Sequence, residues 1–205
     1  MQRGFLKQKR AFVKIALLAA SLAVVGYGAY IALSPAPISF PPTFLWVWRD
    51  AARVSNEMVH FTDGTNQIIG AVNMSDLQGD TARAQSLIRE ARDSNHLAYG
   101  KAVELTQTLQ RLARSLRDIP SAASQRVAYE ALAVELSLVS EFIVYTESLN
   151  RFLDRVAQAL ATNAHTDRQA VEESLRDVNG RAERINAMNA EFTKKMERFN
   201  VSTDG

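Results

Sequence analysis

Two short patterns in the sequence contain residue types that could hold a pair of metal ions. Glu57-x-x-His60 has the spacing of half of the carboxylate-bridged di-metal site that occurs inside some four-helix bundles. The nearest match to a second half is Asp93-x-x-His96. A metal site requires ligands that converge on one inward point, whereas the helical spacing described below places Met58 in the core and its neighbours Glu57 and His60 outside it. We therefore interpret both patterns as solvated surface residues and expect no bound metal.

The sequence offers few other groups for catalysis. None of the three histidines falls on a predicted core position, and His165 lies in a predicted loop. We find no serine-histidine-acid set, no glycine-rich phosphate loop and no convergent acid pair. The absence of cysteine excludes disulfides, thiolate metal sites and cysteine nucleophiles. We therefore expect a protein that is not an enzyme and that carries no cofactor.

The basic residues are concentrated at the N-terminus. Five of them precede the first apolar segment: Arg3, Lys7, Lys9, Arg10 and Lys14. No acidic residue occurs before Asp50. Without these five, 19 of the 24 basic residues remain against 22 acidic ones, so the rest of the chain is mildly acidic although the sequence pI is about 9.0. A nucleic-acid-binding domain would need a basic face, and we expect no nucleic-acid partner.

Residues 15–33 contain no charged side chain and are about as long as a helix must be to cross ~30 Å of hydrocarbon. A cleaved signal peptide would have a shorter apolar region followed by a small-x-small site. Here the best such site, Gly26-Tyr27-Gly28, lies inside the apolar run. We therefore predict a retained transmembrane anchor. The basic tail, residues 1–14, is expected in the cytoplasm and the remainder outside, at a bacterial inner membrane.

The segment after the anchor is rich in proline and aromatic residues. Residues 34–42 contain four prolines and predict an extended linker. Four aromatic side chains lie in or just after it: Phe40, Phe44, Trp46 and Trp48. They would suit the outer headgroup level of the bilayer, or they could pack into the foot of the following domain.

Residues 43–200 show apolar or small residues at alternating steps of four and three, in segments 47–72, 84–119, 128–159 and 171–199. The second segment has eleven such positions: Ala84, Ile88, Ala91, Asn95, Ala98, Ala102, Leu105, Leu109, Leu112, Leu116 and Ile119. A mean period of 3.5 keeps one stripe against neighbouring helices along its length. The third segment has a second apolar row, which indicates more than one neighbour. Residues 201–205 are expected to be a disordered tail.

The breaks between segments carry helix start and stop signals. Ser75-x-x-Gln78 and Thr166-x-x-Gln169 fit a capping box, and Pro120 should end the second helix. Short joints require neighbouring helices to run antiparallel. The predicted fold class is all-α: a transmembrane helix followed by an elongated up-down-up-down four-helix bundle, or coiled-coil-like rod.

Four polar residues occupy predicted core positions: Thr65, Asn95, Glu135 and Asn189. They could fix the register of the helices, form a polar ligand pocket or lie at the exposed edge of the bundle, and of these we favour register. We expect Asn95 and Asn189 to lie at similar heights in the bundle. Glu135 is expected to reach the bundle edge, because burial of a lone carboxylate is costly.

These patterns favour a structural or interaction protein, a scaffold or adaptor, that is tethered to the lipid bilayer and holds an envelope protein. The alternative is a sensory ligand-binding four-helix module, broadly similar in layout to chemoreceptor periplasmic domains, that works with a partner signalling subunit. In a third arrangement, the apolar stripes of different chains pack against one another, and the protein is a coiled-coil homo-oligomer.

Overall fold

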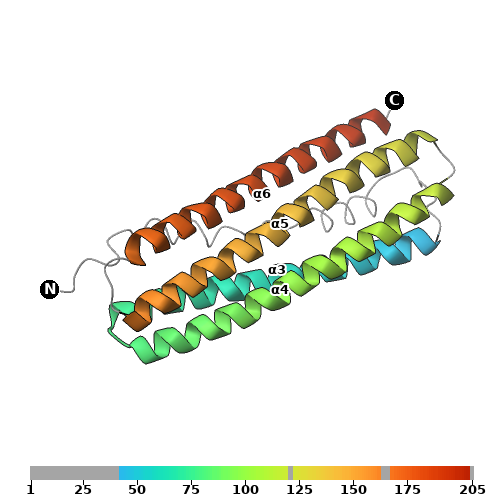
Figure 1. Ribbon diagram of the computed structural model, residues 1–205. Coiled ribbons are helices and arrows are strands. Elements are labelled where there is room, and N and C mark those ends of the chain that lie inside the picture. Colours follow the sequence, from blue (N-terminus) through green and yellow to red (C-terminus); the bar gives the residue numbers. More distant parts are fainter. Residues whose placement is uncertain (1–41, 120–121, 163–166, 204–205) are drawn as a thin grey trace.

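The computed structural model describes residues 42–119, 122–162 and 167–203. Within these ranges the chain forms four α-helices and one short 3-10 helix, and no strand. In chain order they are α3 (Pro42–Leu77), α4 (Thr81–Ser115), η1 (Leu116–Asp118), α5 (Ala122–Thr162) and α6 (Asp167–Thr203) (Figure 1). The predicted all-helical fold is therefore confirmed for the described residues.

Several predicted features lie outside the described residues. They are the basic tail with Arg3, Lys7, Lys9, Arg10 and Lys14, the apolar segment 15–33, the linker up to residue 41 with Phe40, and residues 204–205. Within the three described ranges, no helix is both long and apolar enough to cross a membrane.

The four helices are long and of similar length. They contain 36, 35, 41 and 37 residues, which corresponds to about 53–62 Å each at 1.5 Å per residue. Cross-helix bonds show that α3 and α4 are antiparallel: Asp50 near the start of α3 bonds to Arg111 near the end of α4, whereas Phe61 further along α3 bonds to Ser94. Figure 1 shows the same alternation of direction for α5 and α6.

The extensive helix contacts follow chain order. Among the described helices, α3 packs on α4, α4 on α5 and α5 on α6. Helix α5 therefore has two extensive neighbours, as its second apolar row predicts, whereas α6 packs mainly on α5. The described part of the bundle is an open row of antiparallel hairpins (Figure 1).

The core follows the predicted stripes closely. All eleven stripe positions of the second segment are buried, from Ala84 to Ile119. On α5 the largest fully buried side chains include Tyr145 and Phe152, and on α6 Val178 and Ile185 are buried. Small residues at the α4 positions let neighbouring backbones approach, while the large side chains of α5 fill the space between helices.

The turn between α3 and α4 differs from the predicted capping box. Ser75 lies inside α3, and the backbone N–H groups of Gly79 and Asp80 donate to the carbonyls of Asp76 and Ser75, each at 3.0 Å. This is a Schellman motif, which needs a residue with positive φ at the position of Gly79, where φ is 77°. Asp80 then caps α4, because its Oδ1 accepts the N–H of Arg83 at 3.0 Å. The prediction that Ser75 starts a helix was wrong.

Two helix ends also differ slightly from the predicted domain bounds. Pro42, assigned by sequence to the linker, is the first residue of α3, where its fixed φ and missing N–H are tolerated. At the other end, α6 continues to Thr203, past the predicted limit at residue 200. Pro120 and Thr166, the predicted stop and start signals, lie outside the described residues.

Candidate functional site

Asn95 is the best-connected of the four predicted polar core residues. Its side chain is only 1% exposed. The Nδ2 atom donates to the backbone carbonyl of Thr146 and to Oδ1 of Asn150, both at 2.8 Å and both on α5. These hydrogen bonds offset the cost of removing the buried amide from water. They form only when α4 and α5 are in this register. The arrangement favours the register interpretation of Asn95 over a ligand pocket.

Thr65 and Glu135 are both buried but differ in their hydrogen bonds. The Thr65 hydroxyl donates to the carbonyl of Phe61 in its own helix at 2.8 Å, so it needs no other partner. Glu135 is 3% exposed, and neither carboxylate oxygen has a hydrogen-bond partner among the described residues. Burial raises the pKa of Glu135 to about 7. The prediction that this carboxylate reaches the bundle edge was therefore wrong: the side chain is buried, and a shift toward the neutral form lowers the free-energy cost of that burial.

Asn189 does not lie at the height of Asn95. Asn95 is level with Thr146 and Asn150 on α5, whereas Arg184 of α6 is level with Glu141. Asn189, five residues beyond Arg184, is thus separated from Asn95 by about 15–20 Å along the bundle axis. Its side chain is half-buried. The four polar core residues do not come together in one pocket, contrary to what a shared ligand site would require.

The three described residues of the predicted membrane-interface set have different environments. Phe44 is 3% exposed, and its ring stacks on that of Trp48 with centroids 6.2 Å apart. Trp46, in contrast, is 64% exposed. Phe44 and Trp48 thus pack into the foot of the bundle, which was one of the two expectations, and Trp46 remains on the surface.

In the metal-type pattern near the middle of α3, the carboxylate of Glu57 forms ion pairs. The Glu57 carboxylate lies 2.6 Å from Arg53 and 2.6 Å from Lys101 of α4. Hydrogen bonds from Lys101 and then Arg53 lower the pKa of Glu57. His60 is exposed and faces Phe61 at 5.7 Å between ring centroids. Two cations therefore compete with any metal for the Glu57 oxygens.

The second metal-type pattern also stays on the surface. Asp93 and His96 are both exposed, and the His96 ring stacks on Tyr99 at 6.4 Å. Across residues 42–119, 122–162 and 167–203, no group of three or more histidine, aspartate or glutamate residues could hold a metal ion. The two patterns are therefore not brought together into one site.

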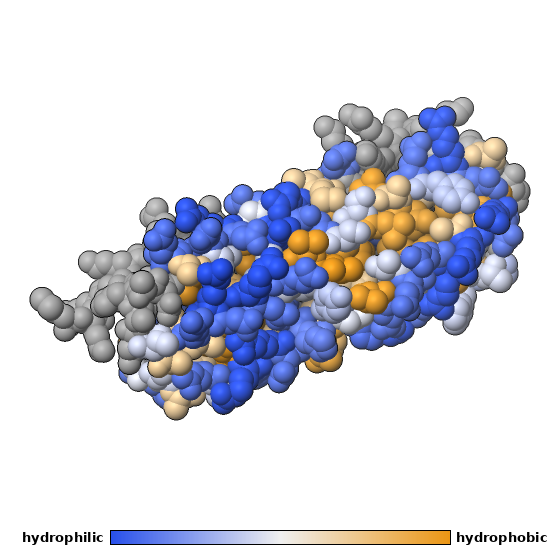
Figure 2. Space-filling model, viewed as in Figure 1, coloured by the Kyte–Doolittle hydropathy of each residue, from blue (hydrophilic) through white to orange (hydrophobic). Residues whose placement is uncertain are grey.

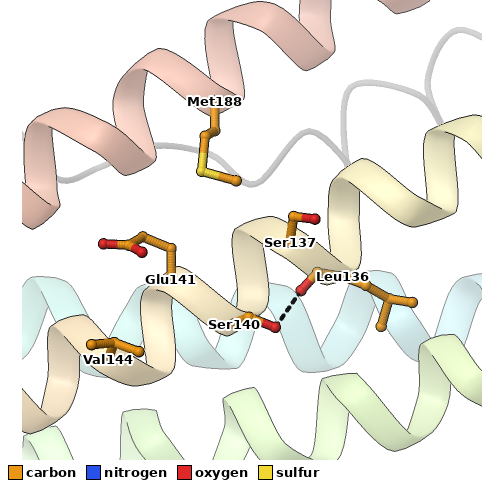
Figure 3. A pocket seen from close by; sticks show the side chains of 6 residues that line it. All are labelled: Leu136, Ser137, Ser140, Glu141, Val144 and Met188. Atoms are coloured by element: carbon orange, nitrogen blue, oxygen red, sulfur yellow. Dashed lines mark hydrogen bonds between the residues drawn. The ribbon is translucent and has the colours of Figure 1, made fainter.

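A shallow groove lies on α5 beside α6. It is lined by Leu136, Ser137, Ser140, Glu141, Val144 and Met188 (Figure 3). Figure 2 shows hydrophobic residues gathered along the middle of this face, between hydrophilic rims. The polar groups of the groove are already paired: Ser137 and Ser140 donate to carbonyls of their own helix, and Glu141 binds Arg184 at 2.9 Å. The groove therefore lacks a free polar group that would orient a small molecule.

Sequence reasoning missed two sets of polar contacts. The partner of Asn95, Asn150, sits beside a core stripe rather than on it, so the heptad pattern gives no signal. Asp50, Arg53 and Glu57 follow each other at spacings of three and four and form ion pairs on α3. That spacing is readable in a sequence as a charged helix face. The further bonds to Arg111 and Lys101 of α4 require knowledge of the helix pairing.

Comparisons of the chain with protein-family models, with curated proteins and with solved structures gave no match.

Proposed function

We propose that this protein is a membrane-anchored extracytoplasmic scaffold or adaptor that acts through its helical bundle. Residues 15–33 would form the anchor, with the N-terminus in the cytoplasm and the bundle in the periplasm or at the cell surface. The observation that carries this proposal is the uncharged apolar run of residues 15–33, preceded by five basic residues and no acidic one. The bundle that follows supplies a long, internally paired body that suits a spacer between the bilayer and a partner.

The described residues support an interaction role over a small-molecule sensor. A sensor pocket needs convergent polar groups, whereas Asn95 and Thr65 bond within the protein and the serines of the groove bond to their own helix. Exposed apolar side chains, in contrast, are present at the end of the bundle opposite the start of α3. Met74 is 55% exposed and Leu77 is 54% exposed, next to the turn between α3 and α4.

A photo-crosslinking experiment tests the interaction role. A photoreactive amino acid is placed at Leu77, at the exposed tip, and in a control at Gln107, an exposed polar position of α4. We expect one discrete crosslinked species with a second protein, or a second copy, from position 77 but not from position 107. Exclusively monomeric protein from both positions would contradict the proposal. Stabilisation of the full chain against heat by a small molecule would instead favour the sensory alternative.

A further inference from the structure

Three segments at one end of the bundle carry exposed arginine and aromatic side chains. Each segment contributes a pair of residues spaced three apart, about one helical turn: Trp46 with Arg49 in α3, Arg114 in α4 with Arg117 in η1, and Arg126 with Tyr129 in α5. We refer to these six residues as the arginine–aromatic band. All six are exposed, with Trp46 at 64% and Tyr129 at 41%. Figure 1 shows that the starts of α3 and α5 and the end of α4 lie at the same end of the bundle.

Contacts between the helices join the three segments into one surface. Asp50, the neighbour of Arg49, accepts a hydrogen bond from Arg111 of α4 at 2.8 Å. On the other side of α4, the Tyr129 hydroxyl donates to the carbonyl of Ala113 at 3.4 Å. The band is therefore continuous from α3 across α4 to α5.

The band carries an excess of unpaired positive charge. Within the described part of the chain, Arg49, Arg114 and Arg117 form no ion pair, and Arg126 pairs with Glu130 at 3.1 Å. Among the described acidic residues near these arginines in the sequence, Asp118 forms no ion pair, whereas Asp50 and Glu130 do. Guanidinium groups bind phosphate oxygens through two parallel hydrogen bonds, which makes unpaired arginines suitable ligands for phosphate groups.

We propose that the arginine–aromatic band lies on the bilayer surface, where its arginines bind the phosphates of anionic phospholipid headgroups and Trp46 and Tyr129 enter the interfacial layer. Tryptophan and tyrosine favour this layer because one end of each ring system is apolar and the other forms hydrogen bonds. The inference rests on the proposed function, since it takes residues 15–33 as the anchor. Eight residues, 34–41, lie between the proposed anchor and α3, and a chain of this length can span at most about 30 Å at ~3.6 Å per residue. The end of the bundle that carries the band is thus the end that the linker holds near the headgroups.

Fluorescence quenching of the full chain in lipid vesicles tests this inference. The protein has two tryptophans, so Trp48→Phe leaves Trp46 as the single reporter. The variant is inserted into phosphatidylcholine vesicles with and without phosphatidylglycerol, each containing a headgroup spin-labelled lipid. We expect at least twofold stronger quenching of Trp46 in the anionic vesicles, because each arginine near an anionic surface favours contact by about fivefold.

Two pairs of substitutions provide the matched comparison. Arg114→Gln with Arg117→Gln should abolish the extra quenching in anionic vesicles. Arg83→Gln with Arg89→Gln, which removes two exposed arginines from the opposite end of the same helix, should leave it unchanged. Equal effects of the two pairs, or equal quenching in both kinds of vesicle, would overturn the inference. The inference would also be overturned if Trp46 were shielded from solvent in native membranes but not in protein-free vesicles. The partner of the band would then be an acidic protein.

Flotation of the vesicles after alkaline washing separates the inference from the anchor on which it depends. A chain that floats with the vesicles but shows no extra Trp46 quenching retains its anchor, and only the headgroup contact is refuted. A chain that is washed off the vesicles refutes both the anchor and the headgroup contact.

Discussion

Asn95 on α4 and Asn150 on α5 are joined side chain to side chain, with 2.8 Å between Nδ2 of the first and Oδ1 of the second. The same Nδ2 also donates to the carbonyl of Thr146. A shift of α4 by one heptad would put an apolar side chain of the stripe opposite Asn150 and would bury Asn95 without a partner. This pair therefore penalises other alignments of the two central helices.

Replacement of either asparagine should destabilise the fold, and the two effects should not add. Asn95→Ala leaves Asn150 Oδ1 without its donor, so we expect a loss of about 1–3 kcal/mol in the free energy of unfolding. Asn150→Ala should cost less, because Asn95 keeps its bond to Thr146. The double variant should lose less than the sum, since both substitutions remove the same hydrogen bond. Urea denaturation of the detergent-solubilised protein, followed by circular dichroism, measures these changes, and strict additivity would contradict the shared bond.

Glu135 should make stability depend on pH in the direction opposite to that of a salt-bridged carboxylate. Its pKa is about 7 in the folded protein against an ordinary value of 4.5, so the folded state binds more protons between these two pH values. Stability should therefore fall as pH rises from about 4.5 to about 7, by about 3 kcal/mol, and should change no further above that range. Glu135→Gln should remove this slope and be more stable than the wild type above pH ~7.

A comparison of stability against pH for the wild type and Glu135→Gln separates the contribution of Glu135 from the contributions of the ion-paired acidic residues. Lowered pKa values at Asp50, held down first by Arg53, and at Glu57, held down first by Lys101, make stability fall in the opposite direction, as pH drops below their unfolded values. These contributions are common to wild type and Glu135→Gln and cancel in the difference. Glu147→Gln, at an exposed position of the same helix, controls for the loss of one carboxylate. An identical pH slope in wild type and Glu135→Gln would refute the buried carboxylate.

Two glycine-to-alanine substitutions should act with opposite signs. Gly79 has φ of 77°, where a Cβ atom is strained, so Gly79→Ala should lower stability by about 1 kcal/mol. Gly100 lies inside α4, and a Cβ atom there meets nothing within 4 Å. Gly100→Ala should therefore raise stability by about 0.5–1 kcal/mol. Thermal unfolding monitored by circular dichroism compares the pair, and destabilisation by both would show that α4 is not a regular helix around Gly100.

Helix α6 should be the first to separate from the bundle. Among the described helices its extensive contacts are with α5 alone, and Glu141 of α5 binds both Arg181 and Arg184 across that interface. Glu141→Gln should speed amide hydrogen exchange in α6 about fivefold, as expected for loss of about 1 kcal/mol, without a change at the turn between α3 and α4. Glu130→Gln breaks a pair within α5 and serves as the control. Equal acceleration in α4 and α6 would show that the bundle opens as one unit.

The periodic part of the fold was predictable because heptad spacing directly reflects which helix face is buried. The stripe of α4 and the double row of α5 illustrate this, and they predicted the core and the neighbours of α5. Residue type alone gave the wrong prediction at Ser75, which fits a helix start but lies in the last turn of α3, because Gly79 and Asp80 fit the backbone of the turn better. Glu135 was misplaced because the pattern shows a position on a helix face but not how deeply that position is buried in the folded chain.

The candidate site was less predictable than the fold, for a physical reason. Hydrogen-bond partners such as Asn95 and Asn150 are 55 residues apart in the chain, and only the offset between two helices brings them together. The same holds for Glu57 and Lys101, whose pairing removes a carboxylate from the metal-type pattern on α3. Spacing within one helix contains no information about that offset.

Cysteine accessibility tests the central claim of an anchored, extracytoplasmic bundle most directly. The chain has no cysteine, so Ser86→Cys in α4 and Lys7→Cys in the basic tail each introduce a single thiol. Intact spheroplasts are treated with a membrane-impermeant maleimide, and labelling is compared before and after permeabilisation. We predict that Ser86→Cys is labelled before permeabilisation and Lys7→Cys only afterwards, with both proteins resistant to alkaline extraction from the membrane. Labelling of Ser86→Cys only after permeabilisation, or release of the protein by alkali, would contradict the account.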